Sequence, residues 1–128
     1  MKKLFLFLFL SIYTMQAFAL SNQAVRSELQ EMTKMFNLPM QIDSITTITS
    51  VTVYGARGLM YTYKLSVSGD DLPGIWMVRS TQKKNVLDML CTNEAMFWFN
   101  DNNVDLIYQY LDKDENPLMI FSINSTEC

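Results

Sequence analysis

The chain has 128 residues, a formal net charge of −3, two cysteines and no histidine. This length predicts one small domain. The acidic balance argues against nucleic acid and against an anionic membrane surface as partners, because both need clustered Lys and Arg. Without histidine, the chain lacks the commonest general base, the commonest zinc ligand and every Ser-His or Cys-His catalytic pair.

The N-terminal segment predicts export. Two lysines precede an apolar block over residues 4–13, and Ala17 and Ala19 are the small residues that a signal peptidase site needs. The block is too short for a permanent membrane anchor, which takes about 20 residues. We therefore expect a signal peptide over 1–19 and, after its removal, a single periplasmic domain over 20–128 that is not inserted in the membrane.

A helix and a β-hairpin are predicted first in the mature domain. Ser21 or Asn22 can cap the helix, and Asn37 follows its end. Residues 45–54 are rich in β-branched side chains, and an alternating strand after the turn at 55–58 completes the hairpin. The apolar positions of the helix are Val25, Leu29, Met32 and Phe36, and those of the second strand are Leu59, Tyr61, Tyr63, Leu65 and Val67.

A loop over 68–74 and a second helix come next. The apolar run over 75–78 is too short for periodicity to assign it to a helix or to an extended segment. From Ser80, which can act as the cap, the apolar spacing predicts a helix that ends near Cys91 and packs across the sheet. Its apolar face consists of Val86, Leu87 and Leu90.

A short helical turn and a second strand pair follow. Thr92 or Asn93 can cap the turn, and the Asn and Asp residues at 100–103 end it. Strands are predicted over 104–111 and 118–123, joined by an acidic turn. The element order α-β-β-α-β-β predicts a two-layer α+β domain, with a mainly antiparallel sheet of about four strands packed with two to three helices.

Cys91 and Cys128 are expected to form a disulfide, since the periplasm is oxidising and only one pairing exists. The bond should stabilise the fold by about 3 to 4 kcal/mol in the chain-entropy account. Neither cysteine has the basic or Cys-x-x-Cys setting of a reactive thiol. Thiol catalysis is therefore not expected.

Acidic residues gather on two predicted turns, at Asp70-Asp71 and over 112–116. A carboxylate pair can serve acid–base catalysis, and the alternating oxygen ligands of 112–116 resemble a calcium loop. However, the glycine and the distal glutamate of an EF-hand are missing, and acidic residues are ordinary solvated turn formers. We therefore expect no catalytic residue, no metal and no cofactor.

Aromatic residues are the main candidates for binding. They either fill the layer between sheet and helices, or line a groove that receives an apolar peptide or helix of a partner. The consecutive rings at 97–99 favour a groove, because one helix face cannot bury all three. Ile107 and Leu111, on the opposite face of their strand, favour it too. The predicted partner-binding residues are Trp76, Trp98, Tyr61, Tyr63, Tyr108 and Tyr110.

The C-terminal unit resembles a known family. Cys91-Thr92-Asn93 opening a short helix, then a turn, a strand pair and the closing Cys128, resembles the small disulfide-containing pilotins of type II secretion systems. Segment 38–43 (LPMQID), with 61–63 (YTY) after it, is similar to a wider set of uncharacterised exported bacterial proteins. Pilotins are lipoproteins that bind a C-terminal segment of the secretin, so the resemblance implies a protein-binding fold. This chain lacks their lipidated N-terminal cysteine.

Two functions fit these features. The leading hypothesis is a non-enzymatic periplasmic binding protein that captures a protein or peptide partner, as an accessory of a secretion or envelope assembly. The alternative is an immunity or inhibitor protein that blocks a toxin or lysozyme with an acidic loop such as Asp70-Asp71 or 112–115. The two differ in the surface used, an apolar groove or an acidic loop. An enzyme is the third alternative.

Overall fold

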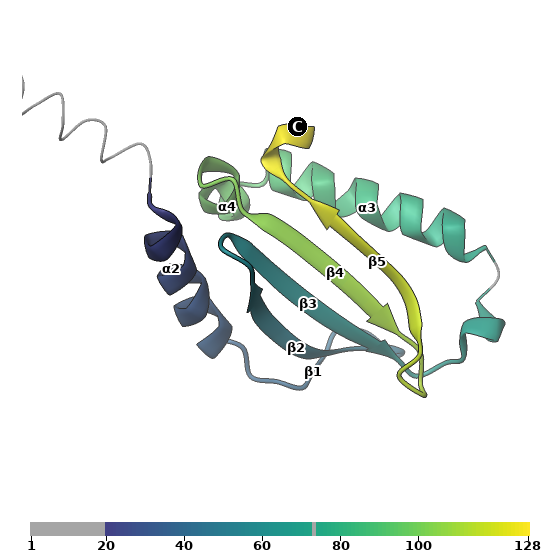
Figure 1. The fold of residues 1–128 in the computed structure, drawn as a ribbon. Helices are drawn as coiled ribbons and strands as arrows, with labels where there is room; N and C mark the ends of the chain where they lie inside the picture. The colour runs from purple at the N-terminus through teal and green to yellow at the C-terminus, as the bar shows by residue number, and fades with distance from the viewer. Residues whose placement is uncertain (1–19, 73) are drawn as a thin grey trace, which may run out of the picture.

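The computed structural model describes residues 20–72 and 74–128, with residues 75–77 as backbone only. The signal peptide predicted over 1–19 lies outside the described residues. The chain forms a twisted sheet with helices along two of its sides (Figure 1). The main elements are α2 (Asn22–Lys34), β1 (Met40–Gln41), β2 (Thr46–Tyr54), β3 (Gly58–Leu65), α3 (Ile75–Thr92), α4 (Phe97–Asp101), β4 (Asp105–Leu111) and β5 (Pro117–Ile123).

The five strands lie in the order β1-β2-β3-β4-β5. Neighbouring strands are antiparallel except β3 and β4, which are parallel. The parallel pair follows from the chain path, because α3 carries the chain from the end of β3 back to the start of β4. The predicted α+β class with a mainly antiparallel sheet is confirmed. The two-residue strand β1 adds a fifth strand to the four that were predicted.

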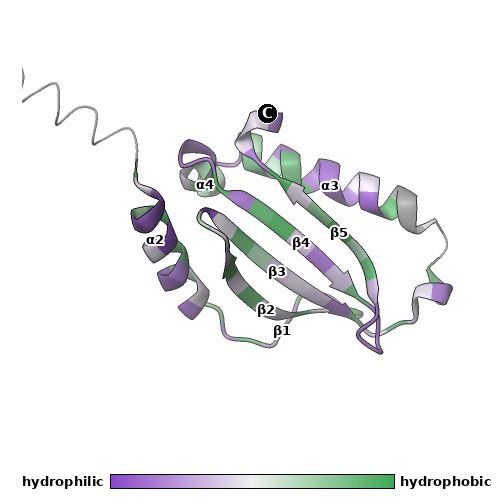
Figure 2. Cartoon of the chain, viewed as in Figure 1, coloured by the Kyte–Doolittle hydropathy of each residue, from purple (hydrophilic) through white to green (hydrophobic). Residues whose placement is uncertain are grey.

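Helix α2 forms where the apolar spacing predicts it. The Ser21 hydroxyl caps its N-terminus by accepting a hydrogen bond from Ala24 N at 3.1 Å. Val25 and Leu29 are fully buried, and the other two residues of the predicted apolar face pack partly buried against the same core. Hydrophilic residues occupy much of the rest of the helix (Figure 2).

Helix α3 begins at Ile75, so the run over 75–78, for which the sequence left a helix and an extended segment open, is helical, and the predicted cap at Ser80 was wrong because Ser80 lies inside the helix. Gly74 precedes the helix with a φ of 73°, a left-handed conformation that glycine adopts without penalty. Backbone geometry therefore starts this helix without a side-chain cap, and periodicity does not reveal such a start. The predicted apolar face is confirmed, since Leu90 is fully buried and its two neighbours on that face pack against the core.

One face of the sheet carries the hydrophobic core. The register places Leu59 of β3 beside Leu106 of β4, and both side chains are buried. Val25 of α2 and Leu90 of α3 belong to the same cluster, so both helices cover this face. Burial of each large apolar side chain contributes about 1.5–3 kcal/mol, which makes this two-layer packing the main source of stability.

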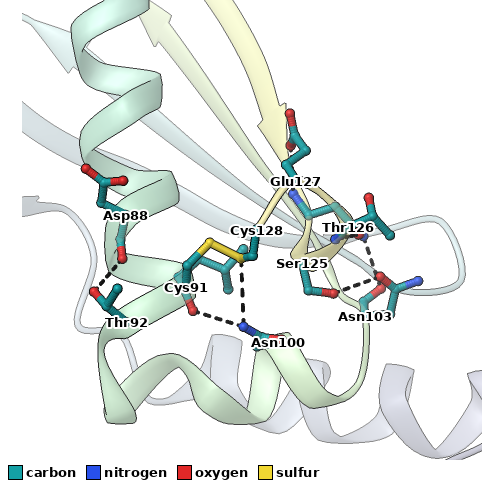
Figure 3. Close-up of a disulfide and its surroundings, with 11 residues drawn as sticks. Asp88, Cys91, Thr92, Asn100, Asn103, Ser125, Thr126, Glu127 and Cys128 are labelled. Carbon is teal, nitrogen blue, oxygen red and sulfur yellow. Dashed lines mark hydrogen bonds between the residues drawn. A yellow bond between two sulfur atoms is a disulfide. The ribbon is translucent and has the colours of Figure 1, made fainter.

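The disulfide fastens the C-terminus to the end of α3. Cys91 and Cys128 are bonded, with their Cα atoms 5.6 Å apart, as predicted. Asn100 Nδ2 donates a hydrogen bond to Leu90 O at 3.4 Å beside the disulfide (Figure 3). The Asn93 side chain caps the turn that follows α3, again as predicted. The residues after β5 are thereby joined to the helical layer.

Arg57, in the turn between β2 and β3, connects three segments. Its Nη1 donates to Asn22 Oδ1 at 2.8 Å and to Leu20 O at 3.2 Å. Its Nε and Nη2 donate to Asn102 O at 3.1 Å and 2.8 Å. The start of α2, the hairpin turn and the end of α4 therefore meet at one guanidinium group.

Candidate functional site

Four of the predicted binding residues form a stack of tyrosine rings on the core face. The parallel register pairs Tyr61 with Tyr108 and Tyr63 with Tyr110. The ring centroids of the first pair are 5.2 Å apart and those of the second pair 4.7 Å apart, with nearly parallel planes. Phe121 of β5 continues the stack at 5.3 Å from Tyr108. Directly opposed positions on neighbouring strands hold the rings in contact.

The tyrosines belong mainly to the core. Tyr108 and Tyr110 are each only 7% exposed, whereas Tyr61 and Tyr63 are half-buried. Burial raises the pKa of Tyr61 to about 12, and it raises the pKa values of the other three as well. Gln82 Nε2 of α3 donates to the Tyr110 hydroxyl at 3.2 Å, which opposes part of that rise. At neutral pH the stack is therefore uncharged.

Trp98 does not join this stack. Trp98 lies in α4, where it packs edge-on against Phe99 at 5.6 Å and is half-buried against the core. Trp76 lies in the first turn of α3, and its side chain is outside the described residues. The structure thus brings together four of the six predicted residues, and the role of the set in partner binding stays a prediction.

A separate hollow lies on the opposite face of the sheet. Met60, Ile107 and Ser122 form a row across β3, β4 and β5, because they are register partners on neighbouring strands. Tyr54 of β2 and Ile120 of β5 lie on the same face beside this row and are 59% and 54% exposed. They line a hollow of about 430 Å³ together with Phe121, whose ring belongs to the stack on the core face, and two residues of α3 border it. Helices α2 and α3 both contribute to the core cluster on the other face, and α3 also reaches the hollow through these two residues.

The two residues that α3 contributes to the hollow are basic. Arg79 and Lys83 are one helical turn apart, so they lie on the same side of α3. Lys83 Nζ forms an ion pair with Glu127 at 3.3 Å, and both side chains are partly exposed. The hollow therefore combines an apolar floor with a basic border.

Sequence patterns gave only part of this site. Ile107 was noted as an apolar residue on the opposite strand face, but Met60 and Ile120 were not singled out. These three are large apolar residues that alternate with or lie beside polar ones such as Thr62, Gln109 and Ser122 on that face, which is the signal that could have found them. The basic border gives no comparable signal, because its position beside the sheet depends on the packing of α3.

The two acidic segments, Asp70-Asp71 and 112–116, form turns in the structure, as predicted. The Asp112 carboxylate accepts hydrogen bonds from Asp114 N at 2.9 Å and from Asn116 N at 2.8 Å. The hydrogen bond from Asn116 is the largest cause that lowers the pKa of Asp112 below its ordinary value. Asp70 and Asp71 lie exposed on a 3-10 turn (Gly69–Asp71). Within residues 20–72 and 74–128, no three acidic or cysteine side chains gather as a metal site would require.

The described helices give no membrane span, since none of those within 20–72 and 74–128 is both long enough and apolar enough to cross a bilayer. No family model matches the chain, and no curated protein matches it. Solved structures do match, and the fold is similar to that of pilotins of type II secretion systems. At these low identities the likeness concerns the fold alone.

Three solved structures are similar over most of the chain. A Pseudomonas aeruginosa protein described as secreted has a TM-score of 0.71 at 16% identity, with 86% of this chain and 97% of its own covered. The pilotin EpsS of the Vibrio vulnificus type 2 secretion system has a TM-score of 0.60 at 6% identity, with 84% and 90% covered. The pilotin AspS of the Vibrio cholerae type II system has a TM-score of 0.55 at 11% identity, with 84% and 91% covered.

Proposed function

We propose that the chain is an exported, non-enzymatic binding protein that captures a protein partner on the open face of its sheet. The observation that carries this proposal is the hollow of about 430 Å³ over Met60, Ile107 and Ile120. Apolar side chains exposed together on one face, next to a rim of polar residues, are typical of an interaction site. The hollow lies on the strands, so it is held rigidly.

Two further observations support export and a protein partner. A disulfide such as Cys91–Cys128 is typical of proteins that fold in an oxidising compartment. Two of the similar folds are pilotins of secretion systems by name. An accessory role in an envelope or secretion assembly is the function of this class that agrees best with an open apolar face and a predicted signal peptide.

The absence of histidine and the bonding of both cysteines support a role without catalysis. The turn over 112–116 does not favour the inhibitor alternative, because Asp112 uses its carboxylate to hold its own turn. An inhibitor loop would need to present its carboxylates to an enzyme.

Affinity capture with matched variants tests the proposal. Ile120→Asp places a charge in the hollow, and its exposed position should leave the fold intact. Met35→Asp is the control, since Met35 is 83% exposed at the end of α2 and does not line the hollow. We expect wild-type and Met35→Asp protein to retain one common envelope partner and Ile120→Asp to lose it.

Two results would contradict the proposal. One is a partner that all three proteins retain equally, because its binding would not involve the hollow. The other is recovery of a hydrolase that is lost on Asp70→Asn and Asp71→Asn substitution and is unaffected by Ile120→Asp, because this result would select the inhibitor role.

A further inference from the structure

The proposed function does not say which kind of partner segment binds in the hollow. The residues at the border of the hollow indicate the chemistry of that segment. We propose that the hollow takes an apolar peptide segment that carries carboxylates, with Arg79 and Lys83 as the groups that bind the acid. This inference rests on the proposed function.

The first argument is position. Arg79 and Lys83 both line the hollow, and Ile107 and Ile120 line the same space on the strands. Because α3 packs against β5, a peptide whose apolar side chains contact Ile107 and Ile120 would lie next to α3. Acidic side chains one turn or two strand positions away from the apolar ones would then reach the two cations.

The second argument is charge. The chain as a whole is acidic, with a formal net charge of −3, yet both charged residues that line this hollow are basic. Among the described side chains, Arg79 has no ion pair and no hydrogen bond. Lys83 is paired with Glu127, but the pair is partly exposed and such pairs contribute little. A carboxylate on a partner can therefore replace Glu127 at Lys83 and add the missing partner at Arg79.

The third argument is size. A hollow of about 430 Å³ lies within the roughly 300–1,000 Å³ range of sites for compact ligands. It is large enough for a few side chains and too small for a folded domain. A short segment of a partner therefore fits, with electrostatic attraction setting its orientation and apolar contact supplying most of the affinity.

Peptide selection tests this inference with a defined probe. Random 16-residue peptides displayed on phage are selected on the oxidised protein, with the Ile120→Asp variant used for counter-selection. We expect the selected peptides to combine large apolar residues with Asp or Glu. A resynthesised peptide should bind Arg79→Gln/Lys83→Gln protein about three- to tenfold more weakly than wild type, the size expected for two partly exposed charge pairs.

Lys84→Gln is the matched control, because Lys84 is on the same helix, is exposed and does not line the hollow. It should leave the affinity unchanged. Peptides that need Ile120 but show no acidic preference, or equal binding to the Arg79→Gln/Lys83→Gln protein, would overturn the charge assignment and leave the proposed function standing. Failure to select any peptide that depends on Ile120 would overturn the peptide ligand itself. Binding of dodecanoate in the wild-type hollow, with no peptide binding there, would overturn it too.

Discussion

Removal of the disulfide gives the most quantitative prediction for the fold. Substitution of Cys91 and Cys128 by serine opens a loop with a sequence separation of 37. In the chain-entropy account, closing a loop of this length lowers the entropy of the unfolded chain enough to stabilise the protein by about 4 kcal/mol. With about 4 °C of melting temperature per kcal/mol for a domain of this size, the variant should melt about 16 °C lower.

Thermal unfolding followed by circular dichroism measures this change. Wild-type protein treated with a reductant should melt at the temperature of the double-serine variant, and the reductant should not affect the variant itself. The contacts of Asn100 beside the bond remain in the variant, so the native fold should persist at low temperature. Equal melting temperatures for the oxidised wild type and the variant would show that the disulfide between α3 and the C-terminus does not stabilise the fold.

Three further predictions concern other parts of the molecule. Arg57→Ala removes the hydrogen bonds to Asn22 and Asn102 and should lower the free energy of unfolding in urea by about 1–3 kcal/mol. An unchanged value would show that these hydrogen bonds do not stabilise the fold. Because the pKa of Tyr61 is raised from 10.0 to about 12, its contribution to stability is complete below pH 10 and should be lost as the pH rises toward 12, and melting temperatures independent of alkaline pH would contradict its burial. Trp98 does not line the hollow, so Trp98→Ala should leave partner capture unchanged, and weakened capture with an unchanged circular dichroism spectrum would place the binding on the predicted aromatic residues instead.

Much of the fold follows from local patterns. The spacing from Val25 to Phe36 and the alternation around Tyr61 report which face of each element is buried, because burial repeats with the period of the helix or strand. The disulfide was predictable since only two cysteines are present. By contrast, β1 contains two residues, too few to establish a period. The start of α3 depends on the backbone of Gly74 and not on a side-chain cap.

The candidate site was less predictable, because it depends on which strands become neighbours. Met60 and Ile107 lie far apart in the sequence, and only the parallel pairing of β3 with β4 places them side by side. The tyrosines show the same dependence, since the pairing of Tyr61 with Tyr108 converts two alternating strands into one buried stack. Sequence periodicity identifies the face of a side chain but not its neighbour on the next strand.

Photo-crosslinking in the bacterial envelope tests most directly whether the open sheet face binds a partner. A photoreactive phenylalanine analogue replaces Ile120 in the hollow or, as the control, Met35 at the end of α2, since both positions are exposed and tolerate a large side chain. The proposed function predicts one discrete crosslinked protein from position 120 and none from position 35. The same crosslink from both positions, or a crosslink from position 35 alone, would contradict it.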